Sequence, residues 1–112
     1  MPPKKNPLNL NPLQLRTLTL LQELARLENK PAEDEVGGFQ ITALPHAHGN
    51  HFHLGHSVVA AKDATGLQND AVWTILERKG IVKRTPGAAI LTATGVEYDT
   101  GLRDQILHQS NH

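Results

Sequence analysis

The sequence contains no cysteine, and this absence excludes disulfide bonds, thiolate zinc sites and cysteine nucleophiles. Aromatic residues make up only 4% of the chain, so aliphatic side chains, mainly leucine, must fill the core. No apolar run approaches the roughly 18 residues of a membrane-spanning helix, and residues 1–6 lead into no signal-peptide core. We therefore expect a cytoplasmic protein with no membrane segment.

A net charge is also absent. Eleven lysines and arginines balance eleven aspartates and glutamates, so the formal charge is zero when the histidines are neutral. A protein that binds phosphate backbones usually carries a basic excess, because counterion release drives that affinity. Any basic surface must therefore be local. The seven histidines would make the chain cationic if they became protonated together, near about pH 6.

The 112 residues fit one domain with one modest core. Residues 1–10 contain three prolines and predict a flexible N-terminal arm, whereas residues 11–112 form the expected domain. Asn11-Pro12 has the composition of a helix start, and the leucine stripe that follows predicts an amphipathic helix that ends before Pro31. Residues 39–44 then alternate apolar and polar side chains, as a half-buried strand does.

Glycines divide the next part of the chain. Ser57 predicts the cap of a short helix over residues 58–64, and Gly66 supplies a residue that accepts a positive φ for the turn after it. A second helix is expected over residues 69–79. Gly80 would end this helix in the left-handed C-terminal position.

Two short strands and a last helix complete the expected elements. Residues 81–85 and 88–92 flank a Pro86-Gly87 turn and predict a hairpin. A C-terminal helix is expected to begin at Thr92 or Thr94 and to end near His108. Its apolar stripe consists of Val96, Leu102 and Ile106. This stripe could join two copies of the chain, or it could pack within one monomer.

This order of elements resembles the winged helix-turn-helix superfamily of small bacterial regulators. Two segments carry the resemblance, ATGLQNDAVWTILERKGIVKR (residues 64–84) and LTATGVE (residues 91–97). The resemblance covers residues 57–98, with residues 12–28 as the first helix. It implies an α+β winged helix-turn-helix fold with a three-helix core and a two-stranded wing. To this fold the chain would add a His-rich β-hairpin within residues 39–56 and the C-terminal helix.

The resemblance also implies a transcriptional regulator that binds double-stranded DNA, as a homodimer. Helix 69–79 would enter the major groove, while hairpin 81–92 would lie on the DNA backbone. The candidate DNA-binding residues are Gln68, Asn69, Thr74, Arg78, Lys79, Lys83 and Arg84.

A winged-helix module that binds a protein and not DNA is the alternative. The zero net charge favours it, as do Asp70 and Glu77 on the second helix, because carboxylates oppose the phosphate field. A protruding Trp73 or the C-terminal helix would then provide the contact surface. For Trp73 itself we favour partial burial, with the indole N–H reaching solvent.

The segment PHAHGNHFHLGH, residues 45–56, carries a second hypothesis. If Gly49-Asn50 forms a two-residue turn, His48 pairs with His51 and His46 with His53, so that all four imidazoles share one face. Such a face suits zinc or nickel. The same pattern also fits an exposed histidine face without a metal, with Phe52 and Leu54 toward the core, or a surface that responds to pH.

We expect neither an enzyme nor an obligatory cofactor. Ser57 lies beside His56, but adjacent side chains rarely point at each other, and no nearby carboxylate would orient the histidine as a base. The sequence also has no glycine motif for phosphate binding.

Overall fold

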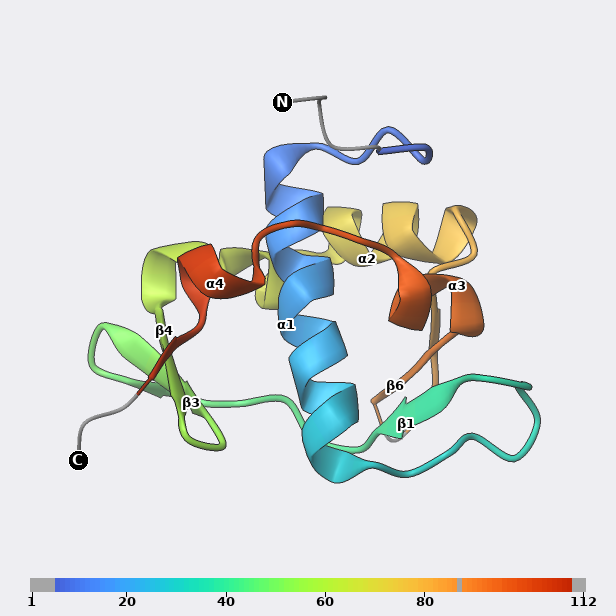
Figure 1. Ribbon diagram of the computed structural model, residues 1–112, viewed down its shortest axis with the longest axis horizontal. Coiled ribbons are helices and arrows are strands. Elements are labelled where there is room, and N and C mark those ends of the chain that lie inside the picture. Colours follow the sequence, from blue (N-terminus) through green and yellow to red (C-terminus); the bar gives the residue numbers. More distant parts are fainter. Residues whose placement is uncertain (1–5, 87, 110–112) are drawn as a thin grey trace.

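Helix α1 (Pro12–Glu28) runs through the middle of an α+β structure, with a small antiparallel sheet on either side of it (Figure 1). This computed structural model describes residues 6–86 and 88–109, apart from the side chain of His48. The described residues contain four α-helices, two short 3-10 segments and two sheets. None of these helices is long and apolar enough to cross a membrane.

The predicted start of α1 is confirmed. The Asn11 side chain accepts a hydrogen bond from the Gln14 backbone N–H (2.8 Å), and the Gln14 side chain accepts one from the Asn11 N–H (2.9 Å). This capping box satisfies N–H groups that a helix start otherwise leaves without partners. The helix ends at Asn29, which has a φ of 52° in the left-handed region. Its buried leucines, which form the centre of the core, are Leu18, Leu20, Leu21 and Leu24.

The segment before α1 packs against the domain. Leu10 is buried, and the Asn6 side chain both donates to the Leu10 carbonyl (2.8 Å) and accepts from its N–H (3.0 Å). The Tyr98 hydroxyl donates to Asn6 as well. Residues 6–10 of the predicted flexible arm are therefore tied to the rest of the chain, and residues 1–5 lie outside the described residues.

The first sheet has the strand order β1-β6-β5. Strands β5 (Val82–Arg84) and β6 (Ala89–Leu91) form the predicted antiparallel hairpin, and β1 (Phe39–Ile41) pairs with the other edge of β6. Leu91 is the partner of both Phe39 and Val82. The hairpin is therefore confirmed, and the predicted strand within residues 39–44 widens it to three strands.

The second sheet has the order β2-β3-β4-β7 and confirms the His-rich hairpin. Strands β2 (Ala47–His48) and β3 (His51–Leu54) pair through a turn at Gly49-Asn50, with His48 opposite His51 as predicted. β7 (His108–Gln109) lies at the far edge. The buried Phe52 and Leu54 face the core, also as predicted.

The predicted helix over residues 58–64 is wrong. Residues Ser57–Ala60 form strand β4, which pairs with β3 and places Val59 opposite Phe52. Two adjacent valines favour a strand, and β3 offers them a partner edge. Only two single turns follow, η1 (Ala61–Asp63) and η2 (Thr65–Gln68).

Helix α2 (Asp70–Arg78) confirms the predicted second helix. The Asn69 side chain caps it by accepting from the Ala71 N–H (3.0 Å), and Gly80 follows it with a φ of 76°. The expected role of Gly66 is wrong, because this glycine lies in η2 and is not among the residues with a positive φ.

The single C-terminal helix that the sequence predicts is divided into two. Helix α3 (Ala93–Glu97) ends at Tyr98, whose backbone is extended, and α4 (Arg103–Ile106) begins after Gly101, which has a φ of 69°. The Thr100 hydroxyl is 2.6 Å from that of Thr19 in α1, so the intervening loop is held by the core. The expected continuous apolar stripe is therefore wrong: Ile106 is buried, whereas Val96 is 37% exposed.

Candidate nucleic-acid interface

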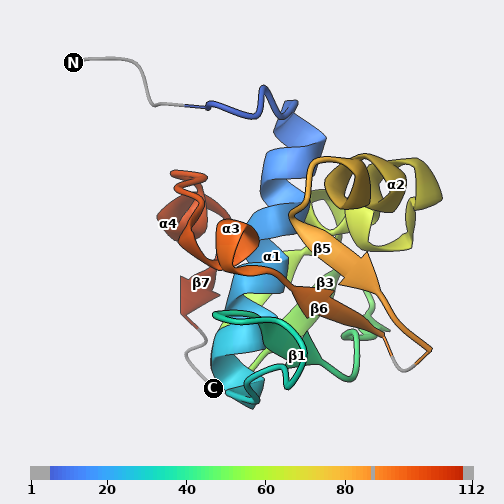
Figure 2. The same cartoon turned by 90° about the vertical axis from the view of Figure 1, so that its right-hand side faces the viewer.

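Helix α2 divides cleanly into a buried face and a polar face. Val72, Trp73 and Leu76 are buried against the core. Gly80, with a φ of 76°, lets the chain turn directly from α2 into β5. Strand β5 therefore lies beside α2 (Figure 2). The hydrogen bond from the Ile81 N–H to the Leu76 carbonyl (2.9 Å) fixes this connection.

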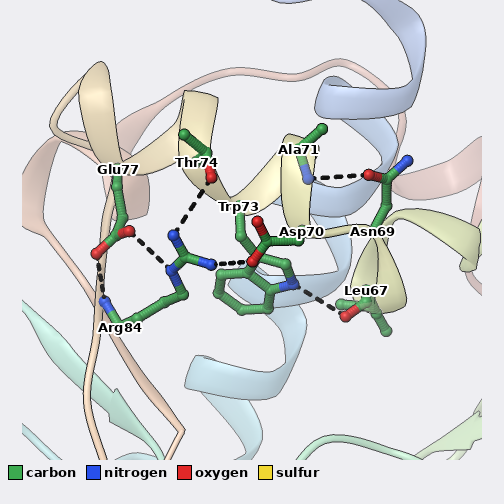
Figure 3. A network of polar contacts seen from close by, with 8 residues as sticks. All are labelled: Leu67, Asn69, Asp70, Ala71, Trp73, Thr74, Glu77 and Arg84. Carbon is green, nitrogen blue, oxygen red and sulfur yellow. Dashed lines mark hydrogen bonds and ion pairs between the residues drawn. The ribbon is translucent and has the colours of Figure 1, made fainter.

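Trp73 is an internal anchor of α2. The residue is 7% exposed, and its indole Nε1 donates to the Leu67 carbonyl in η2 at 2.9 Å (Figure 3). The prediction that the N–H reaches solvent is wrong, because the turn brings a backbone carbonyl to the indole. The alternative of a protruding Trp73 as a partner surface is wrong for the same reason.

The side chain of Arg84 in β5 lies across the polar face of α2 and forms hydrogen bonds with three side chains of that helix (Figure 3). The guanidinium donates to Asp70 Oδ1 from Nη1 at 2.6 Å, and to Glu77 Oε1 from Nε at 2.7 Å. Its Nη2 is 3.3 Å from the Thr74 hydroxyl. The Arg84 backbone N–H also donates to Glu77, at 3.0 Å. We call these four residues the Arg84 network.

The charges of the Arg84 network reinforce one another. The backbone N–H of Arg84 and then its guanidinium hold the pKa of Glu77 below its ordinary value. In turn, hydrogen bonds to Glu77 and then Asp70 raise the pKa of Arg84. Glu77 and Arg84 therefore stay ionised at neutral pH. Asp70 and Arg84 are nevertheless exposed, with side-chain accessibilities of 85% and 38%, so water and salt screen the pair.

The other predicted basic residues differ in whether they form hydrogen bonds or ion pairs within the chain. The Lys79 ammonium donates to the Leu8 carbonyl and so holds the segment before α1. Lys83 is paired with Glu35 at 3.0 Å but remains 60% exposed. Arg78 is exposed and makes no hydrogen bond or ion pair with another described residue.

The remaining two predicted residues flank the start of α2. Gln68 is exposed at the end of η2, whereas Asn69 uses its side-chain oxygen as the helix cap. The structure thus brings Gln68, Asn69, Thr74, Arg78, Lys83 and Arg84 to α2 and its adjoining strand, and directs Lys79 to the N-terminal segment. The contact between Glu35 and Lys83 could not be predicted, because no local sequence pattern connects the two residues.

The predicted metal-binding histidines are only partly brought together. His51 and His53 lie side by side on β3, with their Nε2 atoms 3.1 Å apart. His46 is exposed and precedes β2, and the His48 side chain lies outside the described part of the structure. Among the described residues, no three histidine or acidic side chains form a group that could hold a metal ion.

Comparisons of this chain with known protein families, with curated proteins and with solved structures give no match.

Proposed function

We propose that this chain is a winged helix-turn-helix protein that binds double-stranded DNA and regulates transcription. In this proposal, η1, η2 and α2 form the helix-turn-helix unit, with two single turns where a second helix would stand. The hairpin β5–β6 is the wing. The observation that carries the proposal is the exposed polar face of α2 beside a strand that bears two cations, Lys83 and Arg84. A helix in the major groove flanked by a basic ribbon on the backbone has this arrangement.

In this proposal some of the exposed residues contact DNA bases and others contact phosphates. Gln68 and Arg78, at opposite ends of α2, are free to reach base edges or the nearer backbone. Lys83 and Arg84 would contact phosphates from the wing. Both are already paired with carboxylates, so phosphate has to compete with Glu35 for Lys83 and with the Arg84 network for Arg84. We therefore expect weak non-specific binding and a strong dependence on salt.

Fluorescence anisotropy with a labelled duplex, measured from low to physiological salt, tests the proposal. We expect binding at micromolar protein or below. Arg78→Ala and Lys83→Ala should each weaken it and lower the salt slope by about 1, if each residue contacts one phosphate. Lys30→Ala is the matched control, since Lys30 is exposed just after α1, at the end of that helix remote from α2 (Figure 1).

Absence of binding to pooled genomic fragments at low salt and micromolar protein would contradict the proposal. An equal loss in the Lys30→Ala variant would show that only total charge matters and would count against this interface. Sedimentation of the protein with a bound duplex gives the stoichiometry. Two protein chains per site are expected, because a homodimer places two such helices on successive half-sites.

Neutralising the carboxylates of the Arg84 network should strengthen DNA binding. Asp70→Asn with Glu77→Gln keeps the side-chain shapes, removes two negative charges from the α2 face and releases Arg84. The salt slope should rise by about 1 if Arg84 then reaches a phosphate. Glu33→Gln with Asp34→Asn, in the exposed loop before β1, is the control of equal charge. No gain, or an equal gain in the control, would mean that DNA does not approach this face.

A protein-interaction module is the second candidate, and the Arg84 network is the observation that favours it. An arginine already neutralised by two carboxylates is well suited to a surface that rejects phosphate and accepts a polar protein partner. If the carboxylate variants acquire DNA binding that the natural sequence lacks, the network excludes DNA, and this second function gains support.

A further inference from the structure

Two imidazoles on β3 are arranged as a pair. The Nε2 atoms of His51 and His53 are 3.1 Å apart, and their ring centroids are 4.8 Å apart with an interplanar angle of 79°. Residues two apart on a strand share one face, and Phe52 between them is buried in the core. The pair therefore stands on the outer face of the β2-β3-β4-β7 sheet.

The register of this sheet adds a histidine from the far end of the chain. Val58 of β4 is the partner of His53 on one side and of His108 on the other. Directly opposed residues in an antiparallel sheet share a face, so His53, Val58 and His108 form one row. The spacing between strands places His108 about 10 Å from His53, backbone to backbone. It therefore belongs to the same face but not to the close pair.

The turn before β3 favours the ring form of His51 that a metal requires. Its Nδ1 lies 3.4 Å from the Asn50 side-chain oxygen. That oxygen can only accept, so the contact favours the proton on Nδ1 and leaves the Nε2 lone pair directed toward His53. Metal-binding histidines commonly donate their second ring N–H in this way, which fixes both the tautomer and the ring orientation.

We propose that His51 and His53 chelate a divalent zinc or nickel ion through their Nε2 atoms. Two nitrogens about 2.0 to 2.1 Å from one metal lie about 2.9 to 3.4 Å apart, from square-planar to tetrahedral geometry. The observed 3.1 Å falls within that interval. Among the described residues, no third ligand joins the pair.

The chelate gains affinity from the strand. Once one imidazole binds the ion, the second imidazole is already close to it, so the second bond costs little further conformational entropy. This predicts that the folded sheet binds the ion more tightly than a flexible histidine-rich segment does. The site is independent of the proposed DNA function, since it uses no residue of α2 or the wing.

Calorimetric titration of the untagged full-length chain with zinc and with nickel is the first test. One ion per chain is expected. His51→Ala and His53→Ala should each weaken binding by about tenfold or more, equivalent to at least about 1.4 kcal/mol. His56→Ala is the matched control, because His56 is an exposed histidine in the turn between β3 and β4 and should leave the affinity unchanged. Equal affinity in all three variants would overturn the proposal.

Thermal unfolding with and without the ion is the second test, since it separates a folded site from histidines that bind when unfolded. An ion that binds only the folded chain raises Tm, and we expect this for the natural sequence and His56→Ala but not for the His51→Ala/His53→Ala double variant. Both side chains point away from the core, so circular dichroism should show that the variants fold. A Tm that stays constant or falls when the ion is added would also overturn the proposal.

Discussion

Gly66→Ala is expected to destabilise the protein strongly, because the space that an added Cβ would need is already filled by a side chain of α1. A Cβ built on Gly66 would lie 1.8 Å from the Thr17 hydroxyl oxygen and 3.1 Å from the Thr17 Cβ. Thr17 is fully buried in α1, and its hydroxyl donates to the Leu13 carbonyl at 2.8 Å. Moving it would break that bond and still leave the two Cβ atoms crowded, so η2 would have to separate from α1.

Overpacking of this kind costs about 1 to 3 kcal/mol and sometimes more, and we expect the upper end here because the fully buried Thr17 opposes the new methyl group. For a domain of this size Tm should fall by roughly 10 °C or more. Thermal unfolding followed by circular dichroism measures the effect.

Gly49→Ala is the control for Gly66→Ala. Gly49 has a φ of 66° and open space around its Cβ position, so alanine there should cost only the backbone strain, about 1 to 2 kcal/mol. Thr17→Ala combined with Gly66→Ala should be less harmful than the sum of the two changes, because the first removes the atom closest to the new methyl group. A Gly66→Ala variant no less stable than Gly49→Ala would show that η2 does not pack this closely on α1.

Glu23→Gln is expected to destabilise the protein by about 2 kcal/mol at neutral pH, the range of a hydrogen bond to a charged group. Glu23 is 1% exposed on α1, where Arg26 Nε donates to it at 3.0 Å and Arg103, at the start of α4, donates as well. A neutral amide keeps the size of the side chain but cannot accept from both guanidinium groups as a carboxylate does. Urea unfolding at pH 7 measures the loss, with Glu33→Gln in the exposed loop as the control.

Acid should remove the difference between the natural sequence and Glu23→Gln. Burial raises the pKa of Glu23, but the hydrogen bonds from Arg26 and Arg103 outweigh it, so the pKa in the folded chain lies below the ordinary value of 4.5. A carboxyl with a depressed folded pKa stabilises the protein above its unfolded pKa, and this contribution is lost as the pH falls through the folded value. The two unfolding curves should therefore converge as the pH falls below 4.5 and through the folded pKa. A difference that persists unchanged at pH 2 would contradict an ionised Glu23 in the folded state.

Several expectations that rest on neighbouring residues are confirmed. Asn11 caps α1 because its side chain reaches the N–H three residues ahead, and Gly80 ends α2 because it accepts a φ of 76°. The hairpin β5–β6 and the turn at Gly49-Asn50 follow from residues within a few positions of each other. Each of these signals acts over a single turn, so the sequence contains it in full.

Expectations that depend on distant partners are wrong or incomplete. Residues 57–60 form a strand because β3 provides an edge with which they pair. The role of Gly66 depends on Thr17 in another helix, and not on its own φ. In the candidate site, the polar residues of α2 could be predicted, but the Arg84 network could not, since Asp70 lies fourteen residues before Arg84.

The sequence by itself determined where α1, α2 and the two hairpins begin and end, since caps, left-handed glycines and side-chain alternation act locally. The tertiary structure alone decided which of the predicted cations remain exposed, whether Trp73 reaches the surface, and which histidines face each other. The physical reason is that burial and pairing depend on the surface that packing brings opposite a residue. That surface comes from elsewhere in the chain, as Arg84 meets α2 and His108 joins the face of His53 only after the sheets have formed.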